Sequence, residues 1–377
     1  MPVVPQDTAR LILPTGCDPV LSPVCGPAGD PVLSSACGPA CEQPVQGILL
    51  INKPRGMTSF GVIARVRKLT GQKRVGHTGT LDPFADGLLV VCIGRATQVV
   101  QFMEHYDKIY RVVVAFGRST DTQDLTGRTL FEYHLSESEK EHMRQTDFSD
   151  LRQAAADMVG VHQQIPPMYS AVKINGKPLY DYARKGENLL RKSRTIRIDE
   201  AAVEKIDLDD ALNVTLRIRC SKGTYIRTLA DDLGRRLGIG AHAAFLTRLA
   251  CGPFRLEQAQ ELDDLFDLWR SCSGQGEFAR QIAAKGLLLP QSAALAEYPH
   301  VCLEVHEAED LIAGRPLYNI AAGSGQTDFN RLPEMQTLVF LCCDRLVAVG
   351  HLERTEAGAR RVRTERVLID LADFRQD

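Results

Sequence analysis

Asp82 is the side chain whose setting in this sequence is best suited to chemistry. It lies in a segment, Val75 to Leu89, that contains three glycines, and Pro83 follows it directly. The proline keeps the acid out of the helical backbone region, and the glycines permit backbone angles closed to other residues, so the carboxylate should have a fixed direction. A fixed acid can do chemistry, although a turn closed by the Asp side chain would use the same residues. We therefore expect a loop that presents Asp82.

Arg227 is the second residue in an unusual position. The chain from Ser221 leads into a predicted helix, so that Arg227 falls in its first turn. A cation there opposes the helix dipole, which favours acids at that end. We therefore expect Arg227 to pair with an anion, with Asp82 as the candidate, unless it simply faces solvent.

Basic residues gather in two segments although the formal net charge is only −2. Ile51 to Thr80 holds seven Lys or Arg and no acid, and Lys173 to Arg197 holds eight basic residues against two acids. Tyr180 and Tyr182 lie within the second segment, a mixture of aromatic and charged residues suited to stacking on unpaired bases. Each segment could be an ordinary solvated face, but two of them around one loop fit a footprint for a phosphate backbone.

The elements that must position these residues can be read from hydrophobic spacing and helix-capping residues. Thr58 or Ser59 can cap a helix that ends at Gly71, and Tyr110 lies near the start of a strand. The predicted strands are Gly47 to Pro54, Leu88 to Ile93, Ile109 to Phe116 and Asn213 to Cys220, and the predicted helices include Ser136 to Val161 and the stretch from Ile226 to Leu237.

A chain of 377 residues is long enough for two domains. An acidic stretch after Pro253, followed by small polar residues from Ser271 to Gly276, predicts a junction, and short strands after about Leu287 predict a small β-rich C-terminal domain. Residues 18–40 contain two copies of a twelve-residue near-repeat rich in Pro, Gly and Ser, so residues 1–46 are expected to be a disordered tail.

Several classes of protein are disfavoured by composition. Hydrophobic content of 44% and charged content of 24%, without a run of about 20 apolar residues, argue against a membrane span. The N-terminus lacks the apolar stretch of a secretory signal, which favours the cytoplasm. The eleven cysteines are then more often free thiols than disulfides. Four of them, Cys17, Cys25, Cys37 and Cys41, lack zinc-site spacing, so we expect no metal.

Six separated motifs resemble the TruB family of pseudouridine synthases, which isomerise a uridine in the T-loop of transfer RNA. The resemblance spans about Gly47 to Leu265, and its motifs are Asn52 to Ser59, Gly76 to Pro83, Lys108 to Tyr110, Pro166 to Ala171, Gly223 to Arg227 and Leu246 to Leu249. It implies an α+β pseudouridine synthase fold, with a central mixed, largely antiparallel sheet flanked by helices and loops. The implied organisation is a catalytic domain at 47–270, an RNA-binding insertion around 136–195 and a PUA-like RNA-binding domain at 287–377.

The resemblance also implies roles for individual residues. Asp82 would be the catalytic carboxylate, Arg227 would hold it ionised, preferably through a bidentate pair, and Tyr110 would stack on the extruded uracil. His77 would fill the space that the base leaves, and Tyr225 and Leu246 would contact the substrate. The residues expected to grip RNA phosphates are Lys53, Arg55, Lys73, Arg74 and Lys173.

The implied reaction is conversion of uridine to pseudouridine at position 55 of tRNA, without a cofactor. The expected partner is the T-arm of tRNA, with no obligate protein partner. Two other functions fit the same residues: an RNA chaperone that refolds tRNA, and a pseudouridine synthase that depends on a guide RNA. The joint presence of Asp82, Tyr110 and Arg227 favours catalysis, because binding alone needs no acid facing RNA phosphate.

Overall fold

The computed structural model describes residues 45–318 and 332–375. The tail expected at residues 1–46, with its repeat and four cysteines, lies outside these residues except for its last two. No helix in the described ranges is long and apolar enough to cross a membrane.

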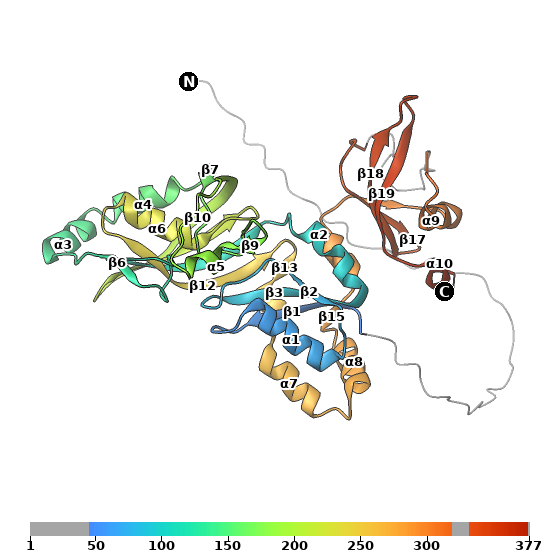
Figure 1. Cartoon of the computed structure of the whole chain (residues 1–377), viewed down its shortest axis with the longest axis horizontal. Helices are drawn as coiled ribbons and strands as arrows, with labels where there is room; N and C mark the ends of the chain where they lie inside the picture. The colour runs from blue at the N-terminus through green and yellow to red at the C-terminus, as the bar shows by residue number, and fades with distance from the viewer. Residues whose placement is uncertain (1–44, 319–331, 376–377) are drawn as a thin grey trace, which may run out of the picture. The chain divides into compact units, whose positions relative to one another are not determined.

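A mixed sheet forms the centre of the fold, with the strand order β14-β1-β3-β12-β4-β11-β10-β7 (Figure 1). Neighbouring strands are antiparallel except for β14 with β1 and β12 with β3, so the sheet is mixed and largely antiparallel, as predicted. Three short strands, β2, β13 and β15, pair at its sides. The strands of this sheet are β1 (Gly47–Lys53), β2 (Val75–Thr78), β3 (Asp86–Ile93), β4 (Lys108–Phe116), β7 (Gly160–Gln164), β10 (Arg194–Leu208), β11 (Leu212–Cys220), β12 (Ala241–Cys251), β13 (Phe254–Arg255), β14 (Gln260–Glu261) and β15 (Leu288–Leu289).

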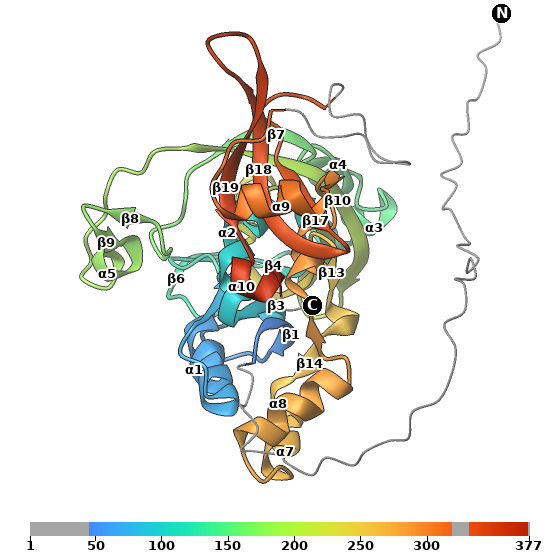
Figure 2. The same cartoon turned by 90° about the vertical axis from the view of Figure 1, so that its right-hand side faces the viewer.

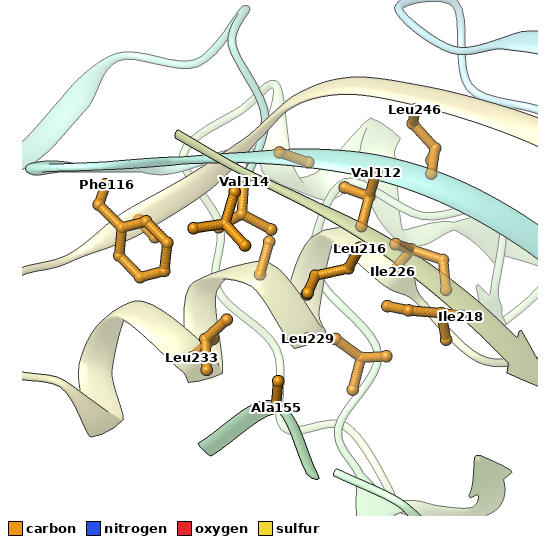
Figure 3. Packing of buried hydrophobic residues seen from close by; sticks show 14 of the residues in the cluster. Val112, Val114, Phe116, Ala155, Leu216, Ile218, Ile226, Leu229, Leu233 and Leu246 are labelled. Carbon is orange, nitrogen blue, oxygen red and sulfur yellow. The ribbon is translucent and has the colours of Figure 1, made fainter. Parts of the chain in front are cut away.

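Helices cover the sheet at two places. The helices of the described chain are α1 (Ser59–Thr70), α2 (Val100–Met103), α3 (Glu137–Gln145), α4 (Ser149–Ala156), α5 (Leu179–Ala183), α6 (Ile226–Arg236), α7 (Leu262–Arg270), α8 (Gln275–Ala284), α9 (Val305–Ile312) and α10 (Leu371–Phe374), with short 3-10 turns at Gly94–Val99, Leu256–Gln258 and Gln291–Leu295. Leu229 and Leu233 of α6 belong to one apolar cluster with Val114 of β4 and Leu216 of β11 (Figure 3). This core anchors the first turn of α6, where Arg227 lies.

The ends of α1 match the capping prediction. The Thr58 side chain accepts a hydrogen bond from the Gly61 amide at 2.9 Å, and Gly71 adopts the left-handed conformation at φ 68° that ends the helix. Val62, Ile63 and Val66 face the core, and α7 and α8 pack into the same apolar cluster as α1 (Figure 1). Because α8 belongs to this cluster, Ser271 to Gly274 is a turn between packed helices. The domain boundary that we expected at residue 270 stays a prediction.

Two further sequence predictions differ from the structure. Val75 to Thr78 is strand β2, paired with β3, so the loop that carries Asp82 is limited to residues 79–85. The helix expected from Ser136 to Val161 is divided into α3 and α4 by Asp147 and Phe148, which adopt positive φ angles of 47° and 55°. A spacing pattern continues across such a break, so it did not show the turn.

The segment between the β5–β6 hairpin and β10 contains α3, α4, β7, the β8–β9 hairpin and α5; the β8–β9 hairpin and α5 lie beside each other in Figure 2. A separate four-stranded sheet, β16-β17-β18-β19, follows in the C-terminal part, with α9 packed against it, and confirms the predicted β-rich character. The remaining strands are β5 (Arg118–Thr120), β6 (Thr129–Glu132), β8 (Lys173–Ile174), β9 (Lys177–Pro178), β16 (His300–Cys302), β17 (Leu338–Cys342), β18 (Arg345–Arg354) and β19 (Arg360–Val367).

Candidate active site

A pocket of about 930 Å³ gathers residues from segments far apart in the sequence. Its walls include six of the residues that the sequence singled out: His77, Asp82, Tyr110, Tyr225, Arg227 and Leu246. They come from β2, the loop after it, β4, the start of α6 and β12. The pocket is thus the place where the predicted chemistry could occur.

The loop carrying Asp82 is held at several points of its backbone. The Leu81 amide donates to Oγ of Ser59 at 2.9 Å, and that hydroxyl donates to the Leu81 carbonyl at 3.1 Å. On the other side of Asp82, the carbonyl of Pro83 accepts from the Gly56 amide at 2.7 Å. These bonds fix the direction of the carboxylate, which keeps 36% of its side chain exposed.

Arg227 is the charge partner of Asp82. Its Nε lies 2.8 Å from Oδ2 of Asp82, although Arg227 itself is buried. Nη1 donates to the Thr122 carbonyl at 2.7 Å, and Nη2 donates to the Tyr169 carbonyl at 2.8 Å. Because these terminal nitrogens are engaged elsewhere, the pair with Asp82 runs through Nε and is not the bidentate arrangement that we expected.

Asp124 is a second carboxylate on Arg227 that the sequence analysis missed. Its Oδ2 lies 3.3 Å from Nη1 of Arg227, and its Oδ1 accepts from the Thr126 amide at 2.9 Å and from the Thr122 hydroxyl at 2.8 Å. The signal available in the sequence was an Asp followed two residues later by Thr in a polar turn, which is an ordinary turn pattern. Nothing in that pattern distinguished it from an exposed turn.

The electrostatic surroundings of Asp82 contain opposing effects. Desolvation raises the pKa of Asp82, and the nearby charge of Asp124 adds to that shift, whereas the cations of Arg227 and Lys53 oppose it. Burial also lowers the pKa of the Lys53 ammonium to about 8, with Asp86 and Asp82 opposing that change. The carboxylate therefore depends on its cationic neighbours to stay ionised.

Tyr110 lies on β4, directly across from Arg248 on β12. Desolvation raises the pKa of the Tyr110 phenol to about 12, and the Arg248 guanidinium partly offsets this. Arg248, also missed from sequence, is fully buried and donates through Nε to the Leu88 carbonyl at 2.7 Å and through Nη2 to the Gly79 carbonyl at 3.1 Å. It therefore ties the start of the loop that carries Asp82 to β3, the strand that follows the loop.

His77 and Tyr225 complete the walls of the pocket. The His77 ring meets Phe60 edge to face, with centroids 5.6 Å apart, and desolvation lowers the pKa of His77 to about 4, so its imidazole is neutral near pH 7. Tyr225 is held by its backbone, because its amide donates to Oε1 of Gln164 at 2.8 Å and its carbonyl accepts from Nε2 at 3.1 Å. Its ring lies 5.9 Å from the Arg194 guanidinium. Leu246 is buried in β12.

The five cations expected to grip phosphates have different surroundings. Lys53 is fully buried and donates to the Pro54 and Met57 carbonyls at 2.9 and 2.7 Å, so it does not present its charge to RNA, and that expectation is corrected. Arg55 is already paired with Asp86 at 2.6 Å. Arg74 donates to Oγ1 of Thr97 at 2.6 Å but is exposed, as are Lys73 and Lys173.

Metal ligands do not gather in the described parts of the chain. Within residues 45–318 and 332–375, no group of three or more His, Cys, Asp or Glu could hold a metal ion.

Comparison with known proteins gives the class first. Residues 67–226 match the TruB family pseudouridylate synthase N-terminal domain, and residues 227–296 match the tRNA pseudouridylate synthase B C-terminal domain. A solved Cbf5-Nop10-Gar1 complex contains a chain of similar fold, with a TM-score of 0.63 and 25% identity, over 87% of this chain and 86% of that one. The fold and these matches define a pseudouridine synthase, which is an isomerase.

Two curated relatives are more similar to this chain in sequence than that solved structure is. The chain is 41% identical to tRNA pseudouridine synthase B of Levilactobacillus brevis over 267 residues, covering 70% of this chain and 82% of the relative. It is 38% identical to tRNA pseudouridine synthase B of Yersinia pestis (strain Pestoides F) over 280 residues, covering 74% and 82%. The chain belongs to the TruB family of tRNA pseudouridine synthases.

Proposed function

We propose that this enzyme isomerises uridine to pseudouridine at position 55, in the T-loop of tRNA, and that Asp82 is its catalytic carboxylate. The observation that carries the proposal is the placement of Asp82 in the wall of the pocket, 2.8 Å from a buried guanidinium. A carboxylate that keeps part of its surface open while a cation holds its charge can react with a sugar.

The reaction exchanges one bond to the sugar for another. The bond between N1 and C1′ breaks, uracil rotates, C5 bonds to C1′, and the proton lost from C5 is balanced by one gained at N1. Asp82 starts this sequence either by attacking C1′ or by removing a proton at C2′. Both routes need an ionised Asp82, which is the contribution of Arg227.

Tyr110 supplies the face on which the extruded uracil stacks, and its hydroxyl assists removal of the C5 proton. A pKa of about 12 means that this hydroxyl is protonated before the substrate binds. Extrusion of the base costs a few kcal/mol, which stacking and backbone contacts must offset. A neutral His77 fills the vacated space without a charged group inside the RNA.

The exposed cations Lys73, Arg74 and Lys173 hold the phosphates of the T-arm, and Tyr225 and Leu246 contact the flipped nucleotide. Binding by these cations should weaken as salt increases, because each neutralised phosphate releases counterions. The C-terminal sheet contributes further RNA contacts as a PUA-like domain.

Release of tritium from 5-tritiated uridine in a bare tRNA transcript tests the activity of the purified chain. Asp82→Asn should abolish release while RNA binding stays within several-fold, and Asp199→Asn, at an exposed acid on β10, should release tritium at the wild-type rate. An Asp82→Asn enzyme that turns over normally would remove Asp82 from the mechanism.

The RNA chaperone and the guide-dependent enzyme predict different results for these proteins. An RNA chaperone would refold tRNA equally well with Asp82→Asn. A guide-dependent enzyme would fail on the bare transcript. The 41% identity to a tRNA pseudouridine synthase B favours the stand-alone enzyme.

A further inference from the structure

Ser170 brings a buried hydroxyl to the wall of the pocket. The residue is 5% exposed, and its Oγ has no hydrogen-bond partner among the described residues. An unpaired buried polar group costs about 1–3 kcal/mol, and nearly all such groups in folded proteins are paired. Alanine would occupy this position without that cost. The hydroxyl is therefore explained best by a partner that arrives with the ligand.

The backbone of Ser170 fixes the origin of this hydroxyl. Its amide donates to the Met168 carbonyl at 2.9 Å, and its carbonyl accepts from the Tyr180 amide at 3.1 Å. Pro166 and Pro167 precede it and restrict the incoming chain. Only rotation about χ1 remains, so Oγ can be directed to a ligand at little entropic cost.

The neighbours of Ser170 indicate which part of the nucleotide lies beside it. The preceding carbonyl, that of Tyr169, accepts from Nη2 of Arg227, and Nε of the same guanidinium contacts Asp82. Arg227 therefore contacts both Asp82 and the residue before Ser170, and in the proposed function the sugar lies at Asp82 with its C1′ or C2′. A serine hydroxyl both donates and accepts, as does the 2′-hydroxyl that distinguishes RNA from DNA.

We propose that Oγ of Ser170 hydrogen-bonds the 2′-hydroxyl of the target nucleotide and so makes Ser170 a substrate-binding residue that selects ribose at this position. The inference rests on the proposed function, because it takes the sugar to lie at Asp82. Ser170 would then recognise the sugar of the target nucleotide. The other groups assigned in this pocket act on the base and on the glycosidic bond.

The test compares T-arm RNAs that carry either uridine or 2′-deoxyuridine at the target position. Dissociation constants are measured by filter binding with Asp82→Asn, which stops turnover, and with Asp82→Asn combined with Ser170→Ala. The Asp82→Asn protein should bind the ribose substrate about three- to tenfold more tightly than the deoxyribose substrate, the range for one neutral hydrogen bond. Addition of Ser170→Ala should bring that ratio close to one.

Thermal unfolding and a matched control separate recognition from structure. Ser170→Ala should leave Tm unchanged or raised, because the hydroxyl has no partner to lose. Ser221→Ala removes a hydroxyl of the same pocket that already accepts from the Arg197 amide at 2.9 Å, so it should lower Tm and keep the ratio.

A ratio unaffected by Ser170→Ala, an equal loss of affinity for both RNAs, or a marked fall in Tm would each overturn the assignment. Failure of the proposed function would look different: the wild-type chain would release no tritium from the bare transcript, or Asp82→Asn would release it at the wild-type rate, whatever residue occupies position 170.

Discussion

Arg227 and Asp124 form an ion pair in which the two side chains are only 4% and 7% exposed, with Nη1 and Oδ2 3.3 Å apart. Asp124 is itself fixed by the amide of Thr126. The guanidinium is therefore oriented before any substrate binds, and its Nε is left for Asp82. Asp124 acts on the site through Arg227, which makes it a positioning residue.

Replacement of Asp124 by Ala should destabilise the protein by roughly 3 kcal/mol, because it leaves Arg227 buried without its second anion. Asp124→Asn should cost less, since its carbonyl oxygen can still accept from Thr126. Urea unfolding measures both changes. A free energy of unfolding equal to the wild-type value for Asp124→Ala would contradict the importance of this pair.

Arg227 should determine the acid limb of the pH profile. In the proposed mechanism only ionised Asp82 is active, so kcat/KM should fall as pH drops through the pKa of Asp82, which desolvation raises. Arg227→Gln removes the largest opposing effect, so the limb should move to higher pH. Single-turnover rates between about pH 4 and 8 measure the position of this acid limb. Arg235→Gln, at an exposed residue of α6, is the control and should keep the wild-type limb.

Tyr110→Phe should separate stacking from proton transfer. The ring remains, so RNA affinity should stay within about threefold, whereas loss of the hydroxyl should reduce turnover by about 10²-fold or more. Tyr110→Leu should additionally weaken binding, because stacking of a base on an aromatic ring contributes about 1–3 kcal/mol. Full turnover by the Phe variant would exclude the hydroxyl from proton removal.

The exposed lysines should contribute to the salt dependence of RNA binding. Lys73→Gln and Lys173→Gln should each reduce the slope of log K against log salt by about 0.7–0.9, the effect of one phosphate contact. Lys205→Gln, at a lysine paired with Asp207, should leave the slope unchanged. An unchanged slope for Lys73→Gln would place that residue outside the RNA footprint.

Local patterns predicted much of the fold. The cap of α1, its end at Gly71 and the strands β1, β3, β4 and β11 followed from side-chain spacing and from backbone preferences. The pairing of Asp82 with Arg227 could be expected because a cation in the first turn of a helix needs an anion. The helix caps and strands depend on residues close together in the sequence, and Arg227 stands at a helix position where a cation is unusual.

The features that were missed depend on distant contacts. Lys53 was expected to contact RNA phosphates and Arg248 was given no role, yet both are buried, and carbonyl groups of the folded chain accept their hydrogen bonds. Asp124 looked like a turn residue because its partner Arg227 is distant in sequence. Burial of a charge depends on which acceptors the tertiary structure brings together, and spacing along the chain does not contain that information.

The position of β12 between β3 and β4 has a consequence during protein synthesis. The ribosome makes β3 and β4 long before β12, the strand that separates them in the sheet and carries Arg248. A nascent chain that has already exposed Asp82 and Tyr110 therefore still lacks both arginines of the site. We expect the unfinished enzyme to be inactive on tRNA, so that the modification begins only after β12 has joined the central sheet.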